Sequence, residues 1–140
     1  ALVGKEDSGN VFYLVTDKSI YITQMDVRNL QLAKAAVSGG IATLADEMQV
    51  DIESVDSLEI AGGFGAFLNM ESAATIGLFP KVLLPVASSV GNTSGEGATA
   101  MLISVAALKG EDEIADTCEY LELSNSMKFM NLYITMMEFE

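Results

Sequence analysis

The stretch 58–80 constrains the fold most, because an apolar run is followed at once by three glycines and then by a helix start. The apolar run 58–61 predicts a short buried strand. Asn69 is a favourable N-cap for the helix that follows, and Pro80 prevents that helix from continuing. The residue types alone therefore predict the order strand, glycine turn, helix.

The glycine turn consists of Gly62, Gly63 and Gly65, with Phe64 between them. Glycine has no Cβ, so the backbone there can approach another group closely. Free backbone N–H groups before a helix also suit an anion such as phosphate. The spacing matches neither GxGxxG nor GxxxxGKS/T, and a tight structural turn that binds nothing is the alternative. The turn by itself leaves both interpretations open.

Composition sets the outer bounds. The 140 residues, 1–140, are the length of one domain, and 50% of them are hydrophobic, which argues against disorder. A net charge of −13 is a poor match to nucleic acid or to anionic membranes. No apolar run approaches the roughly 20 residues that cross a membrane. The chain begins with Ala1 and not with Met, which predicts that it is a piece of something longer.

Cysteine and histidine are nearly absent. The single Cys118 excludes an internal disulfide and a cysteine-ligated iron–sulfur or zinc site within this chain. With no histidine, histidine-based catalysis and histidine metal sites are excluded as well.

The remaining segments predict a sheet with helices packed on it. Strands are expected at residues 11–15, 20–22, 82–87 and 119–123. Helices are expected at residues 23–46, 98–108, 111–117 and 124–137. The first two strands form a hairpin, so the order of elements predicts an α/β fold whose mixed sheet has an antiparallel edge.

The first predicted helix begins at Thr23, which is close to a capping box with Asp26. Arg28, Gln31 and Lys34 are spaced three apart and form a row on its surface, for which a solvated polar face is the plain interpretation. The apolar face beside this row would hold Val27, Leu30, Ala33, Val37, Ile41 and Leu44.

The last predicted helix is rich in methionine and aromatic side chains. Such a stripe is more often core packing, although methionine-rich surfaces also bind partners. The residues concerned are Met127, Phe129, Met130, Tyr133, Met136 and Met137.

Several blocks of residues carry a resemblance to a known family, the reductive activators of corrinoid proteins. The blocks are TQMDVRNLQLAKAA at 23–36, AGGFG at 61–65 with Asn69 and IGLFP at 76–80, VGN at 90–92 with GA at 97–98, and LELS at 121–124 with Phe129 and EF at 138–139. The resemblance covers residues 20–140. These activators are iron–sulfur ATPases whose C-terminal part has the ASKHA fold of acetate and sugar kinases, heat-shock ATPases and actin, a ribonuclease H-like architecture.

The resemblance implies that this chain is the second, C-terminal lobe of a larger actin-like ATPase domain. In that fold two lobes close on ATP or ADP, and the second lobe supplies a glycine pair that follows a strand. Its first helix contacts base and ribose through a pattern like Glu-x-x-Lys, which QLAK at 31–34 resembles with Gln in place of Glu. The residues thereby implied to bind the nucleotide are Arg28, Gln31, Lys34, Gly62, Gly63, Phe64, Gly65 and Asn69.

Other parts of the family pattern are missing here. Its iron–sulfur cluster needs a cysteine group, and its Mg²⁺ needs an acidic phosphate loop, for which Asp7-Ser8-Gly9 is rejected because it does not follow a strand. The resemblance therefore implies that the cluster and Mg²⁺ belong to the rest of a parent protein. No catalytic or metal-ligating residue is assigned to this chain, and we expect it not to hydrolyse ATP by itself.

Three functions stay open at this point. The first is the ATP-binding lobe of a cytoplasmic activator that couples ATP to electron transfer to a corrinoid cobalt in a methyltransferase system. The second is a docking or dimerisation module, in which the acidic surface and the methionine-rich end bind a corrinoid protein or a second copy. The third is half of a small-molecule kinase of the same fold. None of the three involves nucleic acid or a membrane.

Overall fold

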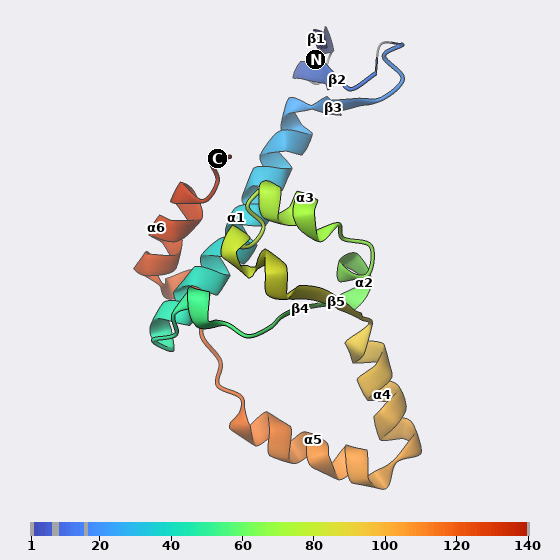
Figure 1. Ribbon diagram of the computed structural model, residues 1–140, viewed down its shortest axis with the longest axis vertical. Helices are drawn as coiled ribbons and strands as arrows, with labels where there is room; N and C mark the ends of the chain where they lie inside the picture. Colours follow the sequence, from blue (N-terminus) through green and yellow to red (C-terminus); the bar gives the residue numbers. More distant parts are fainter. Residues whose placement is uncertain (1, 7–8, 16, 140) are drawn as a thin grey trace.

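The computed structural model describes residues 2–6, 9–15 and 17–139, coloured along the chain in Figure 1. Its elements are β1 (Leu2–Glu6), β2 (Gly9–Tyr13), β3 (Tyr21–Thr23), α1 (Gln24–Glu47), η1 (Ile52–Ser54), β4 (Leu58–Ala61), α2 (Gly62–Gly65), α3 (Met70–Thr75), η2 (Lys81–Val86), β5 (Ala87–Gly91), α4 (Thr93–Ile103), α5 (Val105–Thr117), η3 (Leu123–Asn125) and α6 (Met127–Thr135). The α/β class is confirmed. Within the described residues the strands form two separate sheets, one antiparallel with three strands and one parallel with two.

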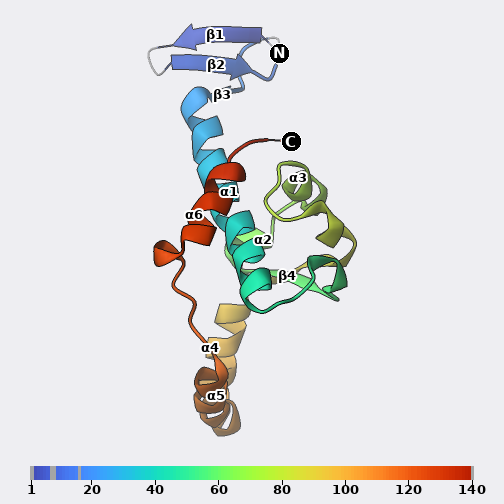
Figure 2. The same ribbon diagram turned by 90° about the vertical axis from the view of Figure 1, so that its left-hand side faces the viewer.

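The antiparallel sheet contains the predicted hairpin. β2 pairs with both β1 and β3, and Val11 in the central strand is fully buried. The rings of Tyr13 and Tyr21 meet edge to face across the β2–β3 pair, with their centroids 6.1 Å apart. Figure 2 shows this sheet at the N-terminal end of α1, while α4 and α5 extend away at the opposite end.

The start of α1 is fixed by the capping box that the sequence predicts. The Thr23 hydroxyl oxygen accepts from the Asp26 backbone N–H at 3.1 Å, and the Asp26 carboxylate accepts from the Thr23 backbone N–H at 2.8 Å. The Thr23 hydroxyl also donates to this carboxylate, at 2.7 Å. The bond from the Thr23 hydroxyl, and to a smaller extent the bond from the Thr23 backbone N–H, lower the pKa of Asp26 below its usual value.

The predicted apolar face of α1 is largely wrong, although Val27 and Ile41 are half-buried and Ile41 packs against the main core. Leu30, Val37 and Leu44 are 40%, 46% and 49% exposed. The helix instead buries small and polar residues, namely Lys34, Ala35, Ser38, Gly39 and Thr43. An apolar stripe therefore does not mark the side of this helix that packs inside the chain.

The physical reason is the close approach of α6 to α1. A Cβ added to Gly39 would lie 3.4 Å from Cε2 of Phe129 and 3.5 Å from the backbone nitrogen of Tyr133. Small side chains on α1 leave room for these two rings, which stack with centroids 5.8 Å apart. The polar members of the buried face are satisfied locally: the Ser38 hydroxyl donates to the Lys34 carbonyl and the Thr43 hydroxyl to the Gly39 carbonyl, at 2.8 and 2.7 Å.

The central stretch folds largely as predicted. β4 (Leu58–Ala61) pairs with β5 in parallel, and the Asn69 side chain accepts from the Ser72 N–H at 2.8 Å to begin α3. The helix ends before Gly77, whose φ of +78° is the left-handed conformation that favours glycine after a helix. The main apolar core lies around this stretch and contains Ala73, Ala74, Leu78, Phe79 and Leu83.

Two predicted strands are wrong. The segment predicted as a strand at 82–87 is mostly the 3₁₀ helix η2, and β5 begins only at Ala87. Pro85 has no N–H to donate to a sheet and its φ is fixed, which suits a helical turn better than a central strand. Residues 119–123, predicted as an edge strand, pair with no strand among the described residues.

Helix boundaries in the C-terminal half also differ. α4 begins earlier than predicted because Asn92 caps it, and α5 runs through Gly110 to Thr117 as one helix. The last helix is capped by Ser126 and not by Ser124, whose N–H bonds the Glu122 carboxylate. The hairpin α4–α5 buries none of its own residues. No helix in the described ranges is both long and apolar enough to cross a membrane.

Candidate functional site

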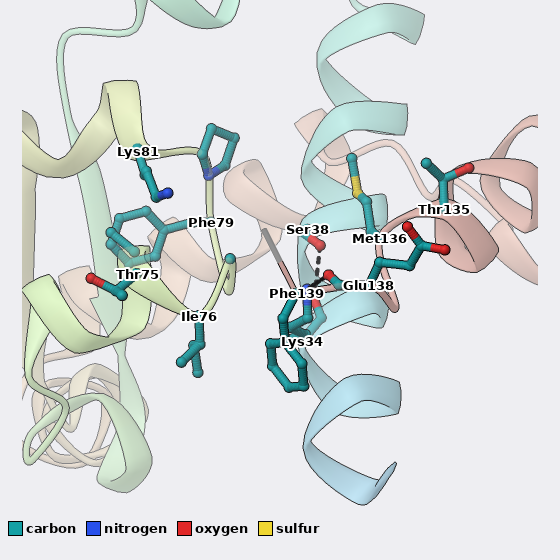
Figure 3. Close-up of a pocket in the computed structure, with 13 residues that line it drawn as sticks. Lys34, Ser38, Thr75, Ile76, Phe79, Lys81, Thr135, Met136, Glu138 and Phe139 are labelled. Carbon is teal, nitrogen blue, oxygen red and sulfur yellow. Dashed lines mark hydrogen bonds between the residues drawn. The ribbon is translucent and has the colours of Figure 1, made fainter. Parts of the chain in front are cut away.

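A cavity of about 510 Å³ lies where three segments meet: α1, the connection from α3 to η2, and the end of α6 (Figure 3). Its size is in the range of small-molecule sites. It is lined by Lys34, Ser38, Ala74, Thr75, Ile76, Gly77, Phe79, Pro80, Lys81, Thr135, Met136, Glu138 and Phe139. The wall is thus mixed, with apolar and aromatic side chains beside two lysines, one glutamate and three hydroxyl groups.

Lys34 is the most unusual residue of the cavity, because its cationic side chain is only 3% exposed. Its Nζ donates to the backbone carbonyl of Glu138 and lies 4.9 Å from the centroid of the Phe139 ring. Gly77 also comes close, since a Cβ added there would be 3.3 Å from Nζ. Among the described residues no carboxylate pairs with this ammonium. A buried lysine without an acidic partner is costly unless something else compensates for it.

Two neighbouring positions add polar character. Ser38 lies one turn after Lys34 on α1, and its hydroxyl donates to the Lys34 carbonyl while its oxygen can still accept. Lys81 begins η2 and is exposed. Lys34 and Lys81 are two of only seven basic residues in a chain of net charge −13. Together with Glu138, they give the described lining two basic residues and one acidic residue.

The other two members of the predicted row on α1 do not line the cavity. Gln31 is half-buried one turn before Lys34, and Arg28 is exposed. Exposure to solvent thus falls along the row from Arg28 to Lys34, and only Lys34 lines the cavity. The prediction that Arg28 and Gln31 bind nucleotide stays a prediction.

The glycine turn folds as α2, a single helical turn directly after β4. Gly62 has a φ of +89°, and a Cβ added at Gly62 or at Gly63 would find no atom within 4 Å. Gly65 differs, because a Cβ there would lie 2.9 Å from the backbone oxygen of Ile60. Gly65 is therefore required by packing, while the first two glycines leave open space beside the backbone.

The structure does not bring the three glycines of this turn to the cavity: of the seven predicted nucleotide-binding residues other than Phe64, only Lys34 lines it. Asn69 has a structural role as the cap of α3. The side chain of Phe64 lies outside the described part of the structure, as do Asp7 and Ser8. These two residues come directly after β1, so the stated reason for rejecting Asp7-Ser8-Gly9, that it does not follow a strand, is wrong. In the described ranges no group of three or more His, Cys, Asp or Glu residues could hold a metal ion.

Sequence reasoning missed most of the cavity lining. Ser38 could have been found, since it lies four residues after Lys34 and so shares its helix face. Gly77, Phe79 and Pro80 also line the cavity. They belong to a block that resembles the corrinoid activators, but the resemblance assigned them no role. Glu138 and Phe139 lie in another such block, also without an assigned role, and nothing in the sequence indicates their contacts with Lys34.

The methionine-rich helix is only partly packed. Phe129 and Tyr133 face Gly39 of α1, and Met136 lines the cavity. Met127 is instead 75% exposed, so the expectation of core packing fails at that end of the helix.

With this fold and cavity in view, comparison with known proteins gives a family. Residues 3–140 match the family described as the C-terminal domain of RACo, the ASKHA domain. Because nearly the whole chain matches, the protein belongs to this family. The resemblance to the activators of corrinoid proteins is confirmed.

Individual relatives agree with the family. The chain is 33% identical over 135 residues to the corrinoid activation enzyme RamQ of Eubacterium limosum, covering 92% of this chain and 23% of that protein. It is 28% identical over 123 residues to a Co(II) methylated amine-specific corrinoid protein reductase of Methanosarcina barkeri, covering 86% of this chain and 23% of the reductase.

A solved structure is similar as well. The reductive activator for corrinoid,iron-sulfur protein superposes with a TM-score of 0.83 and 38% identity, over 94% of this chain and 22% of that chain. This chain therefore spans less than a quarter of the length of each of these three proteins.

Proposed function

We propose that this chain is the nucleotide-binding C-terminal lobe of an ATP-dependent reductive activator of corrinoid proteins. The observation that carries the proposal is the Lys34 ammonium, buried at the wall of a 510 Å³ cavity without a carboxylate partner among the described residues. An ammonium has three donors, and the described residues occupy one of them, through the Glu138 carbonyl. The other two are available to a polar or anionic ligand.

The cavity has the mixture of groups that a nucleotide needs. Small-molecule sites are mostly apolar and aromatic, with a few polar groups that fix orientation. Here Ile76, Phe79 and Pro80 supply apolar surface for a base, and Lys34 and Ser38 supply polar contacts for base or ribose. The open backbone at Gly62 and Gly63 does not line this cavity, so we keep it as a separate candidate nucleotide contact, which substitution at Gly63 tests on its own.

The remainder of the activity belongs to other parts of the activator in this proposal. Mg²⁺ is held by the first lobe and the iron–sulfur cluster by a separate segment, and the assembled cytoplasmic protein uses ATP to drive electron transfer to the cobalt of a corrinoid protein. The chain alone binds nucleotide at most weakly and does not turn it over, because γ-phosphate positioning and charge stabilisation need the missing parts. Relatives whose names state corrinoid activation or corrinoid protein reduction favour this function over half of a small-molecule kinase.

The test is ATP-dependent reduction of a Co(II) corrinoid protein by the full-length polypeptide that carries this chain. We expect Lys34→Ala to raise the ATP concentration needed for half-maximal reduction, while Lys109→Ala, which removes an exposed lysine of α5 outside the cavity, changes nothing. Loss of the Co(II) absorbance follows the reaction. An ATP requirement that is the same in wild type and Lys34→Ala would favour the docking or dimerisation role instead.

A further inference from the structure

Residues 136–139 follow α6 and cross to α1 beside the cavity (Figure 3). In the described part of the chain, the N–H groups of Met136, Met137 and Glu138 bond only to carbonyls of α6, at 2.8 to 3.5 Å. The polar link from this segment to α1 is the Lys34 ammonium, which meets the Glu138 carbonyl and the Phe139 ring together. Lys34 and the end of the segment thus hold each other in place.

Phe139 is only partly covered in this arrangement. Its ring lines the cavity and the residue remains 42% exposed. The Lys34 ammonium, 4.9 Å from the ring centroid, is within the distance of a cation–π contact. A large aromatic side chain that borders a cavity beside a cation leaves apolar ring surface available to a flat ligand.

We propose that Phe139 is a base-contacting, specificity-determining residue of the nucleotide site, and that it and the Glu138 carbonyl position Lys34 towards the same ligand. The inference rests on the proposed function, and it assigns the base of the nucleotide, and not its phosphates, to the part of the cavity beside Phe139. An aromatic ring can stack on the π face of a nucleobase, but it offers neither positive charge nor a hydrogen-bond donor to a phosphate chain. The neighbouring Ile76, Phe79 and Pro80 extend the apolar surface beside this ring.

The experiment compares two ligands on the full-length polypeptide, Mg²⁺-ATP and Mg²⁺-inorganic triphosphate, each titrated by competition calorimetry. Phe139→Leu keeps an apolar side chain and removes the aromatic ring. Loss of one base–aromatic stack corresponds to about 5- to 140-fold in affinity. We expect a weakening in that range for ATP and no change for triphosphate, while Phe139→Tyr retains wild-type affinity for both.

The matched control is Tyr120→Leu, which removes an aromatic ring that is 85% exposed and does not line the cavity. Equal ATP affinity of wild type and Phe139→Leu would overturn the inference, as would an equal loss for ATP and triphosphate, which marks the ring as structural support only. In both cases the proposed function survives if Lys34→Ala still weakens ATP. Failure of the wild-type polypeptide to bind ATP at all would reject the proposed function and this inference together.

Discussion

The cavity around Lys34 and the turn Gly62–Gly65 both carry residues predicted to bind nucleotide, but packing explains them to different degrees. At the cavity, a cation is buried against a carbonyl and a ring that other parts of the chain supply. At the turn, Gly65 lies against Ile60, while Gly62 and Gly63 have no neighbour close enough to require glycine. Packing against Ile60 explains why position 65 is a glycine, so Gly65 gives no evidence for a ligand. Packing explains neither the glycine at position 63 nor the buried charge of Lys34, so these two residues are the ones that test ligand binding.

Gly65→Ala should give the largest change in stability. The added Cβ would meet the backbone oxygen of Ile60 at 2.9 Å, and backbone of a buried turn moves less readily than the end of a side chain. Overpacking of this kind costs about 1–3 kcal/mol in the free energy of unfolding. Urea unfolding of the chain measures it, and a midpoint equal to that of the wild type would show that the turn is not packed as described.

Gly63→Ala should separate binding from stability at the same turn. Its φ is not in the left-handed region and its Cβ position is open, so the melting temperature should change by little or rise slightly. If a nucleotide approaches this backbone, the methyl group blocks it and ATP no longer stabilises the full-length polypeptide. Thermal melts with and without ATP measure both effects. A variant that gains the normal stabilisation from ATP would remove Gly63 from the site.

The capping box at the start of α1 provides the smallest expected effect, remote from both regions. The pKa of Asp26 is lowered on folding by its bonds to Thr23. Its contribution to stability is therefore complete above the unfolded value of about 3.8 and is lost as pH falls through the lower folded value. Asp26→Asn should unfold at lower urea than wild type at pH 7, and the gap should shrink below pH 3.8. A gap independent of pH would contradict the assignment.

Local signals predicted the parts of the fold that depend on neighbouring residues. Thr23 with Asp26 fixed the start of α1, and Asn69 and Gly77 fixed both ends of α3. The buried face of α1 could not be predicted in this way, because it depends on Phe129 and Tyr133, about ninety residues further along the chain. Hydrophobic periodicity indicates which residues can be buried, but not which neighbour will bury them.

The candidate site, like the fold, could be predicted from the sequence only in part. Lys34 was reached through the family resemblance, and Ser38 follows from it by helical spacing. The partners of the Lys34 ammonium lie 104 residues away or more, and one of them is a backbone carbonyl, which any residue could supply. Tertiary contacts of that kind leave no pattern in a single sequence.

The central claim is that the buried Lys34 ammonium serves a nucleotide, and calorimetric titration of ATP into the full-length polypeptide tests it most directly. A hydrogen bond to a charged group contributes about 1.5–3 kcal/mol, so Lys34→Ala should weaken ATP binding by about 10- to 150-fold. Lys109→Ala should bind as the wild type does, and a melting curve should show that each variant is folded. Equal ATP affinity in wild type and a folded Lys34→Ala variant would contradict the claim.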